Sequence, residues 1–283
     1  MRRVIQAIAL AACAACLPRA AAAEPGERVY VVSQAGAALR AIEDGADKPA
    51  FSIALDKAPA ALALAPGGAI AYVTHPDLGK VSVVDLEAQK VVRSLSVSGS
   101  PFGIAVAKGG RLFIGDWNGA HVSVMAVDGR EPEKVIGVGR APAHLLLTPD
   151  ETLLFVANRE SDSVSAVRTA DLSVAATIPV GRAPFALALS PDGARLYVGN
   201  VQSGNVSVID TAKLAVIETV PSGAMPYGAA VTPDGTRVLV TNQQARSVSL
   251  LGTHAAPATI KVGEYPERVA VTADGARAYV ANW

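Results

Sequence analysis

The chain has 283 residues, 51% of them apolar, with 25 basic and 25 acidic side chains. This length and apolar content suffice for a large hydrophobic core. The balanced charge excludes a nucleic-acid binder that relies on bulk electrostatic attraction.

The first 23 residues have the features of a secretory signal peptide. Arg2 and Arg3 form a basic start, an apolar run from 4 to 17 follows, and small residues at 21–23 precede a cleavage point. The apolar run is too short to span a bilayer comfortably. We therefore expect a signal peptide at 1–23 and an exported domain at 24–283, periplasmic or secreted.

A lipoprotein leader is the alternative interpretation of this segment. The residues Leu-Ala-Ala-Cys that end at Cys13 resemble a bacterial lipobox, and cleavage there would leave a lipid-anchored N-terminus. The apolar segment before Cys13 would then be short, which favours soluble export. Cys13 and Cys16 have a C-x-x-C spacing, but their place in the leader favours apolar filler over a redox or metal site. No transmembrane span is predicted elsewhere, because no other stretch is apolar for ~18 residues.

The rest of the chain repeats one pattern of four short β-rich runs separated by turn signals. Such runs, bounded by Gly, Pro, Asp and Asn, are typical of an antiparallel meander. A proline begins the first strand of each repeat, at intervals of 40 to 42 residues: Pro59, Pro101, Pro142, Pro184, Pro226 and Pro266. Four strands in a period near 42 predict an all-β fold, the β-propeller, with four-stranded blades.

Seven second-strand motifs predict seven blade positions; they begin at Tyr30, Tyr72, Phe113, Phe155, Tyr197, Leu239 and Tyr279. Residues 27–56 supply only a second, third and fourth strand, and the chain ends at Trp283, just after the seventh second strand. A complete ring then lacks about 35 residues at this period, which predicts a C-terminally truncated chain. The alternative is a six-bladed ring in which Val269–Thr272 closes the N-terminal blade.

The repeats resemble the YVTN family of β-propellers. The resemblance is carried by SPDGARLYVGN (190–200), TPDGTRVLVTN (232–242), TADGARAYVAN (272–282) and third strands such as VSVID (206–210), and it covers nearly all of 27–283. The chain departs from the pattern at its C-terminal end and at Lys108-Gly109 and Asp116-Trp117. The family includes propellers like the quinoprotein amine dehydrogenase β-chain, surface-layer proteins and exported propellers associated with alcohol oxidation by the quinone cofactor PQQ. Lactonases and haem d1-binding propellers are related.

Candidate site residues depart from the repeat consensus in two sets of loops. The loops before the first strands and after the second strands are expected on one face, around the channel mouth. A mixed aromatic and charged surface there suits a small anion, a peptide or a partner protein, while freely varying solvated loops are the alternative. The candidates are His75, Phe102, Asp116, Trp117, Arg140, His144, Arg182, Phe185, Tyr227, Glu267 and Arg268.

His144 is the most specific of these candidates. It replaces the small residue found at this place in most first strands. Such a histidine suits a metal or haem ligand or a general base, whereas a lone histidine is more often satisfied by a backbone carbonyl.

The preferred function is non-enzymatic binding or scaffolding, and the resemblance adds a role accessory to quinone-linked periplasmic oxidation. The chain has no G-x-S-x-G, H-E-x-x-H, P-loop or dinucleotide motif, so no catalytic or metal residue and no cofactor is assigned. The runner-up is a lactonase-like hydrolase or a haem-handling propeller. A local cluster of Arg140, Arg182 and Arg268 leaves nucleic-acid binding as a third class.

Overall fold

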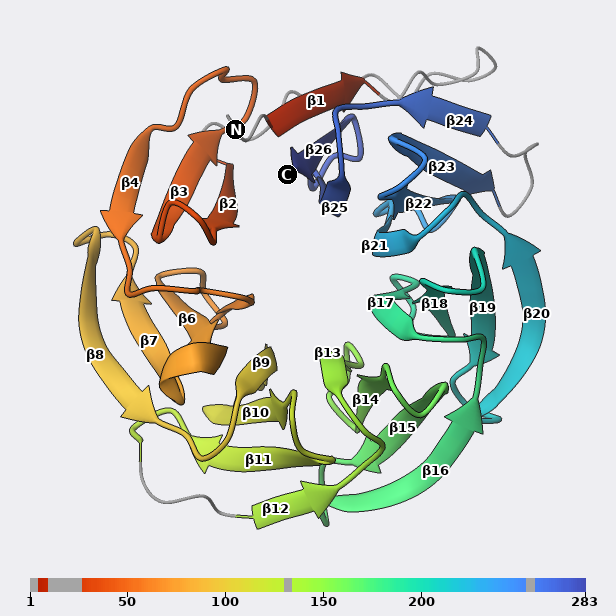
Figure 1. Cartoon of the computed structure of the whole chain (residues 1–283), viewed down its shortest axis with the longest axis horizontal. Helices are drawn as coiled ribbons and strands as arrows, with labels where there is room; N and C mark the ends of the chain where they lie inside the picture. Colours follow the sequence, from red (N-terminus) through yellow and green to blue (C-terminus); the bar gives the residue numbers. More distant parts are fainter. Residues whose placement is uncertain (1–4, 10–26, 130–133, 253–257) are drawn as a thin grey trace. The chain divides into compact units, whose positions relative to one another are not determined.

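The computed structural model describes residues 5–9, 27–129, 134–252 and 258–283, and these residues form an all-β fold (Figure 1). A 3-10 turn, η1 (Pro76–Leu78), interrupts the described strands. No helix in the described ranges is long and apolar enough to cross a membrane. Cys13, Cys16 and the expected cleavage point at Ala23 lie outside the described residues.

The chain divides into two compact units. Unit 1 comprises Met1–Val29, Ile42–Lys48 and Phe185–Trp283, and unit 2 comprises Tyr30–Ala41 and Pro49–Pro184.

Unit 2 contains three four-stranded antiparallel sheets, each with its strands paired in chain order. The first is β5 (Leu62–Leu64), β6 (Ile70–His75), β7 (Lys80–Asp85) and β8 (Lys90–Ser96). The second is β9 (Pro101–Val106), β10 (Arg111–Asp116), β11 (His121–Ala126) and β12 (Lys134–Gly137). The third is β13 (Pro142–Leu147), β14 (Leu153–Asn158), β15 (Ser163–Arg168) and β16 (Ser173–Pro179).

Unit 1 contains two further four-stranded sheets of the same kind. They are β17 (Pro184–Leu189), β18 (Arg195–Asn200), β19 (Asn205–Asp210) and β20 (Ala215–Pro221), then β21 (Pro226–Val231), β22 (Arg237–Asn242), β23 (Ser247–Gly252) and β24 (Ala258–Lys261). The last sheet has three strands in the order β1 (Ile5–Ala9), β26 (Arg277–Asn282) and β25 (Pro266–Val271). A three-stranded sheet of β2 (Arg28–Ser33), β3 (Ala38–Glu43) and β4 (Phe51–Ala54) carries residues of both units.

These sheets confirm the predicted β-propeller blades. Each of the seven predicted second strands is a strand of a separate sheet, and the N-terminal sheet consists of a second, third and fourth strand as expected. Strand β25 pairs with β26, so Val269 lies in the last sheet. Strand β1, from within the expected leader, pairs antiparallel with β26 from Ile5↔Ala281 to Ala9↔Arg277, where a third strand would lie.

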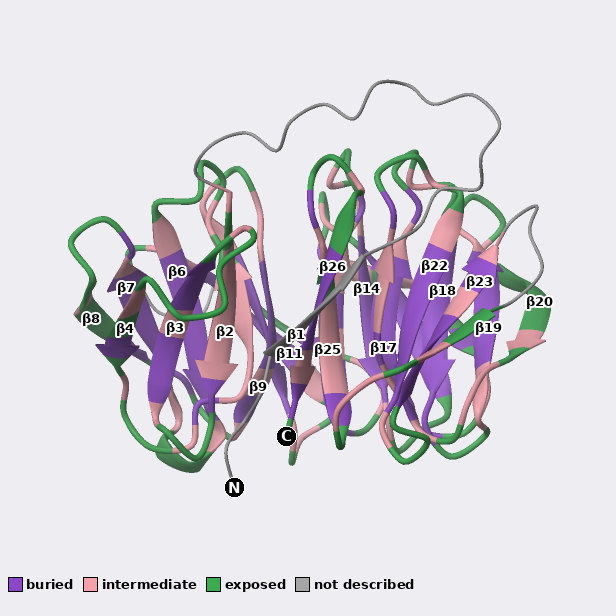
Figure 2. Ribbon diagram, turned by 90° about the horizontal axis from the view of Figure 1, so that it is seen from above, coloured by how far each residue is buried: buried purple, intermediate pink, exposed green. Residues whose placement is uncertain are grey.

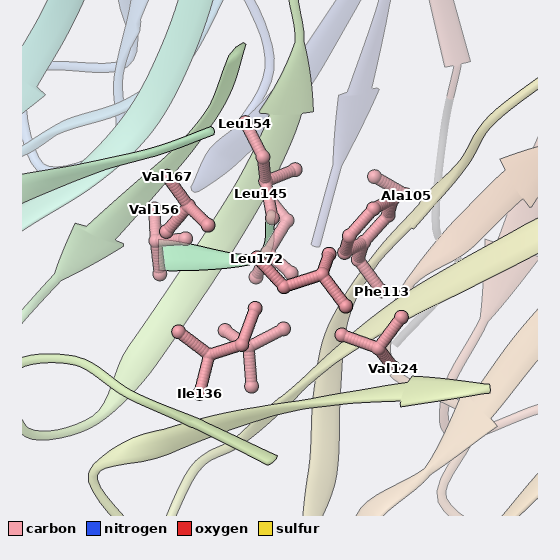
Figure 3. Packing of buried hydrophobic residues seen from close by; sticks show 10 residues of the cluster. Ala105, Phe113, Val124, Ile136, Leu145, Leu154, Val156, Val167 and Leu172 are labelled. Atoms are coloured by element: carbon pink, nitrogen blue, oxygen red, sulfur yellow. The ribbon is translucent and has the colours of Figure 1, made fainter. Parts of the chain in front are cut away.

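The core lies between neighbouring blades. In unit 2, Phe113 and Val124 of one sheet pack with Leu145 and Leu154 of the next, and all four are at most 2% exposed (Figure 3). Burying one such side chain stabilises the fold by about 1.5–3 kcal/mol. Second strands such as β18 are buried almost throughout, whereas outer strands such as β20 are mostly exposed (Figure 2). Neighbouring sheets within a unit therefore bury faces against each other, which explains why their strands lack simple apolar–polar alternation.

The turn between first and second strands explains the repeated Thr-Pro-Asp-Gly motif. The hydroxyl of Thr232 donates to Asp234 Oδ1 at 2.5 Å and accepts from the backbone N–H of Arg237 at 3.1 Å. Gly235 has φ +71°, a conformation that favours glycine. Three other turns repeat the hydroxyl–carboxylate bond: Thr148–Asp150, Ser190–Asp192 and Thr272–Asp274. In the turn of Ser190, this bond is the main reason why the pKa of Asp192 is lowered.

Candidate functional site

Two sets of loops lie side by side in individual blades, as the repeat pattern predicts. The residue after the second strand donates its backbone N–H to the residue before the first-strand proline. In unit 2, Trp117 donates to Ser100 at 2.9 Å, and in unit 1, Gln243 donates to Met225 at 2.8 Å. We call the surface formed by these paired loops and the adjoining start of each first strand the loop face of a unit.

The loop face has an unusual backbone. The residue before the proline is left-handed without being glycine at Ala58, Ala141, Ala183, Met225 and Tyr265, with φ between +47° and +60°. A residue in this position is normally extended, because the proline ring restricts it, and a side chain adds strain in this conformation. Since the feature recurs in both units, it belongs to the repeat and does not by itself mark a single site.

A β-bulge follows the proline in several first strands. The pairing register shifts between Pro142 and His144, between Pro226 and Gly228, and between Pro266 and Arg268. A bulge breaks the regular alternation and re-aims the side chains around it. This is why residues one and two places after the proline lie at the loop face.

Three of the predicted site residues are internal, which corrects their assignment to the accessible surface; Phe185 is 2% exposed, and the other two are His75 and Asp116. His75 is 0% exposed; its Nδ1 lies 3.0 Å from the Lys57 carbonyl oxygen and its Nε2 lies 2.9 Å from Ser82 Oγ. Asp116 is 8% exposed, and its Oδ1 accepts backbone N–H bonds from Ser100 at 2.9 Å and Asn118 at 3.1 Å. The side chains of His75 and Asp116 hold the loop-face backbone and present little surface to a ligand.

The asparagines that end other second strands are internal as well. Asn158, Asn200 and Asn242 are 0% exposed, and each donates from Nδ2 to the serine seven residues later. His75 and Ser82 have the same spacing. That spacing is the sequence signal by which the internal role of His75 could have been found.

In unit 2 the structure brings together Phe102, Trp117 and Arg159. The ring centres of Phe102 and Trp117 are 4.5 Å apart, and the Arg159 guanidinium carbon lies 5.7 Å from the Trp117 ring centre. Aromatic pairs and guanidinium–aromatic contacts each add about 0.5–1.5 kcal/mol beyond area burial. Arg159 comes directly after the second-strand asparagine, the loop position that Trp117 occupies in its own blade.

Three further predicted residues belong to unit 2. Arg140 is exposed, and its guanidinium donates to the Glu160 carbonyl oxygen at 2.9 Å. His144 is half-buried on β13, opposite Ala157. Arg182 is exposed in the loop before β17.

In unit 1 the structure brings together Phe185, Tyr227 and Arg268. The rings of Phe185 and Tyr227 are stacked with centres 4.1 Å apart and planes 28° from parallel. The Arg268 guanidinium carbon lies 5.3 Å from the Phe185 ring centre. Phe185 is 2% exposed, whereas Tyr227, Glu267 and Arg268 are half-buried.

The charge of Arg268 lies in a partly desolvated place. Burial lowers the pKa of its guanidinium, and the nearby Tyr227 and Glu267 act in the opposite direction. An arginine nevertheless remains a cation at neutral pH. Within the described ranges, no carboxylate lies within 4 Å of this guanidinium to form a salt bridge.

The described residues offer no ready-made metal site, since no group of three or more His, Cys, Asp or Glu side chains among them is placed to hold an ion. A groove of about 500 Å³ lies elsewhere in unit 2, and none of the predicted site residues lines it. It is lined by Gly137, Val138, Gly139, Ser161, Asp162, Ser163, Val174, Thr177 and Pro179.

Comparisons with known proteins support the fold. The family model "Lactonase, 7-bladed beta-propeller" matches residues 131–213. Among solved structures, hydrazine synthase from Kuenenia stuttgartiensis superposes with a TM-score of 0.80 at 21% identity, over 92% of this chain and 90% of that chain. No curated protein matches the sequence. The chain is thus a β-propeller protein that is similar, over part of its length, to seven-bladed lactonase propellers.

Proposed function

We propose that this protein is an exported, non-catalytic β-propeller that binds a small ligand or a partner protein through its loop face. The observation that carries the proposal is the pair of aromatic–guanidinium clusters, Phe102–Trp117–Arg159 in unit 2 and Phe185–Tyr227–Arg268 in unit 1. Aromatic and arginine side chains are those most often found at energetically important positions of binding surfaces.

The blade framework supports this use of the two clusters. Loops on a rigid scaffold are the usual place for binding residues. Here the paired loops are tied together by backbone hydrogen bonds, and internal side chains such as Asp116 fix their conformation. The aromatic and arginine side chains therefore project from a backbone that is already ordered, which lowers the entropy cost of binding.

The cellular role that we propose rests on the leader and on the family resemblance. The features of residues 1–23 support export, and the resemblance to quinone-linked propellers supports a partner in periplasmic oxidation. An activity-free accessory role agrees with the lack of a catalytic motif in the sequence.

The experiment compares ligand binding by loop-face variants with binding by an outer-strand control. Thermal shifts of purified residues 24–283 are measured with sugars, lactones, quinones, carboxylates and short peptides. Trp117→Ala or Tyr227→Ala is expected to remove the shift produced by a bound ligand. Ile217→Ala, at a side chain 50% exposed on outer strand β20, is expected to leave it unchanged. Shifts that all three variants retain would contradict the proposal.

A lactonase-like hydrolase is the second candidate, favoured by the family-model match that spans His144. In that reaction a histidine base would take a proton from water while the water oxygen attacks the lactone carbonyl carbon. The ring C–O bond would then break, and the leaving alkoxide would regain a proton to give a hydroxy acid. Lactone turnover that is lost in His144→Ala would establish this candidate and overturn the non-catalytic proposal.

Haem handling through His144 is tested separately by optical titration. A Soret band that shifts when haem is added to the wild type, and not when it is added to His144→Ala, would support it. No spectral change on addition of haem would remove it.

A further inference from the structure

The arginine of the unit 1 cluster is held in place from several sides. Gly228 lies so close to the next strand that a Cβ atom there would come within 2.2 Å of the Glu267 carbonyl oxygen and 3.0 Å of the Arg268 Cα. The Thr241 hydroxyl donates to the same Glu267 carbonyl oxygen at 3.0 Å and accepts from the Gly228 N–H at 2.8 Å. The backbone that carries Arg268 is therefore fixed by the neighbouring blade.

The aromatic pair contacts the side chain of Arg268. The guanidinium lies 5.3 Å from the centre of Phe185, which is itself stacked on Tyr227. An aromatic ring attracts the face of a guanidinium and leaves the N–H donors at its edge free to bind in the guanidinium plane. A planar, fork-shaped donor of this kind suits a carboxylate, which accepts two parallel N–H bonds.

The local charge favours an anion that carries a single negative charge. No carboxylate of the described chain forms a salt bridge with Arg268, so its charge is not already compensated by an ion pair. Glu267, the preceding residue, lies close enough to influence Arg268 electrostatically. A doubly charged phosphate would place two negative charges beside Glu267, whereas a carboxylate would place only one.

We infer that Arg268 binds the carboxylate of an organic monoacid whose flat apolar body lies against Tyr227. This inference rests on the proposed function and specifies its ligand class. The geometry that supports it is a pre-positioned guanidinium, half-buried beside stacked aromatic rings, where charge-assisted hydrogen bonds are stronger than in water.

The test is calorimetric titration of purified residues 24–283 with benzoate. The neutral isostere benzamide, phenyl phosphate and inorganic phosphate serve as comparison ligands. Wild type is expected to bind benzoate in preference to all three. Arg268→Gln is expected to weaken benzoate binding by about 10- to 100-fold, the equivalent of losing one charge-assisted contact. Arg268→Lys keeps the positive charge but lacks the two parallel N–H donors of the guanidinium. Its benzoate affinity is expected to lie between those of the wild type and Arg268→Gln.

Arg195→Gln is the matched control, because Arg195 is an exposed arginine of the same unit at the start of β18, beside the turn from the first strand. Its benzoate affinity is expected to equal that of the wild type. Circular dichroism establishes whether each variant is folded. If Arg268→Gln does not fold, Tyr227→Leu provides the second test. Its affinity for benzoate is expected to be at least about fivefold weaker than that of the wild type.

Four results would contradict the assignment of a carboxylate ligand to Arg268. Absence of benzoate binding by the wild type, equal binding of benzamide, tighter binding of phenyl phosphate, or an unchanged affinity in folded Arg268→Gln would each overturn it. If a neutral ligand or a peptide nevertheless binds and is lost in Trp117→Ala or Tyr227→Ala, the proposed binding function stands without the carboxylate assignment.

Discussion

The hydroxyl of Tyr279 donates a hydrogen bond to the carboxylate of Asp44, 235 residues away in the sequence. The same hydroxyl accepts the backbone N–H of Gly45 at 2.7 Å, and Arg277 pairs with the other Asp44 oxygen at 2.5 Å. Tyr279 is 4% exposed. These contacts lie within unit 1 and attach the turn after β3 to strand β26.

Tyr279→Phe is therefore expected to destabilise the protein by about 1.5–3 kcal/mol, because a bond to a charged acceptor is lost and the Gly45 N–H loses its partner. Urea unfolding of the two proteins measures the difference. Glu264→Gln is the control, because Glu264 and Arg246 form an exposed pair 2.9 Å apart. That change is expected to cost at most about 1 kcal/mol. An equal loss in the free energy of unfolding in the two variants would show that the Tyr279–Asp44 hydrogen bond stabilises the protein no more than an exposed ion pair does.

The Asp44 contact also predicts how stability depends on pH. The Tyr279 hydrogen bond lowers the pKa of Asp44, outweighing the burial that acts to raise it, and Arg277 lowers it further. A carboxyl whose pKa is lower when folded contributes its full stability above its unfolded pKa, about 3.9. That stability is lost as the pH falls through the folded pKa.

The measurement compares the wild type with Asp44→Asn. The stability gap between them is expected to be constant from about pH 5 to 7 and to narrow progressively below about pH 4. Urea unfolding midpoints of the two proteins at successive pH values measure this difference in stability. A gap that stays constant or widens on acidification would rule out an ionised Asp44 as the source of the stability.

The blades could be predicted from sequence because each depends on local signals. The Thr232–Asp234 bond spans two residues, and the Asn242–Ser249 bond spans seven, and each recurs at the same spacing in other repeats. The Asp44–Tyr279 contact has no such local pattern. It joins two segments whose sequences carry no common motif, and only the fold brings them together.

The candidate site was predicted less completely, for a related reason. Residue type suggested that His75 was a ligand, although its imidazole replaces the amide of an internal asparagine in bonding to a serine. Position after the proline is what selected Phe185, Tyr227 and Arg268 as candidates, and the structure shows that their side chains contact one another. Their mutual contacts could not be derived from spacing, because they come from three different blades.

The internal role of His75 can be tested by exchange with the repeat consensus. His75→Asn is expected to cost at most about 1 kcal/mol, because asparagine makes the equivalent bond to serine in other blades. His75→Ala leaves the Lys57 carbonyl and the Ser82 hydroxyl without this partner and is expected to cost about 1–3 kcal/mol. Urea unfolding measures both. A loss of ligand binding in folded His75→Asn would instead return His75 to the binding site.

The turn motif can be tested at Thr232, which is 4% exposed. Thr232→Val keeps the side-chain volume, removes the bond to Asp234 and leaves the Arg237 N–H without its acceptor. The expected loss is about 1–3 kcal/mol in the free energy of unfolding. Thr236→Val, at an exposed position of the same turn, is the comparison and is expected to cost less. If the exposed change costs more, the buried hydroxyl is not what stabilises the turn.

Gly228→Ala tests how closely the blade that carries Arg268 must approach its neighbour. The new methyl group would lie 2.2 Å from the Glu267 carbonyl oxygen, so one strand must move, at an expected cost of about 1–3 kcal/mol. Gly137→Ala is the matched control, since nothing lies within 4 Å of a Cβ atom there. That strand position is expected to tolerate alanine within about 0.5 kcal/mol.

The same substitution separates stability from site geometry. Because the shift falls on Glu267 and Arg268, benzoate affinity is expected to drop in Gly228→Ala even at temperatures where the variant is fully folded. Calorimetric titration well below the melting temperature measures this, with Gly137→Ala at wild-type affinity. A folded Gly228→Ala protein that binds benzoate as tightly as the wild type would mean that the position of Arg268 does not depend on this close contact between strands.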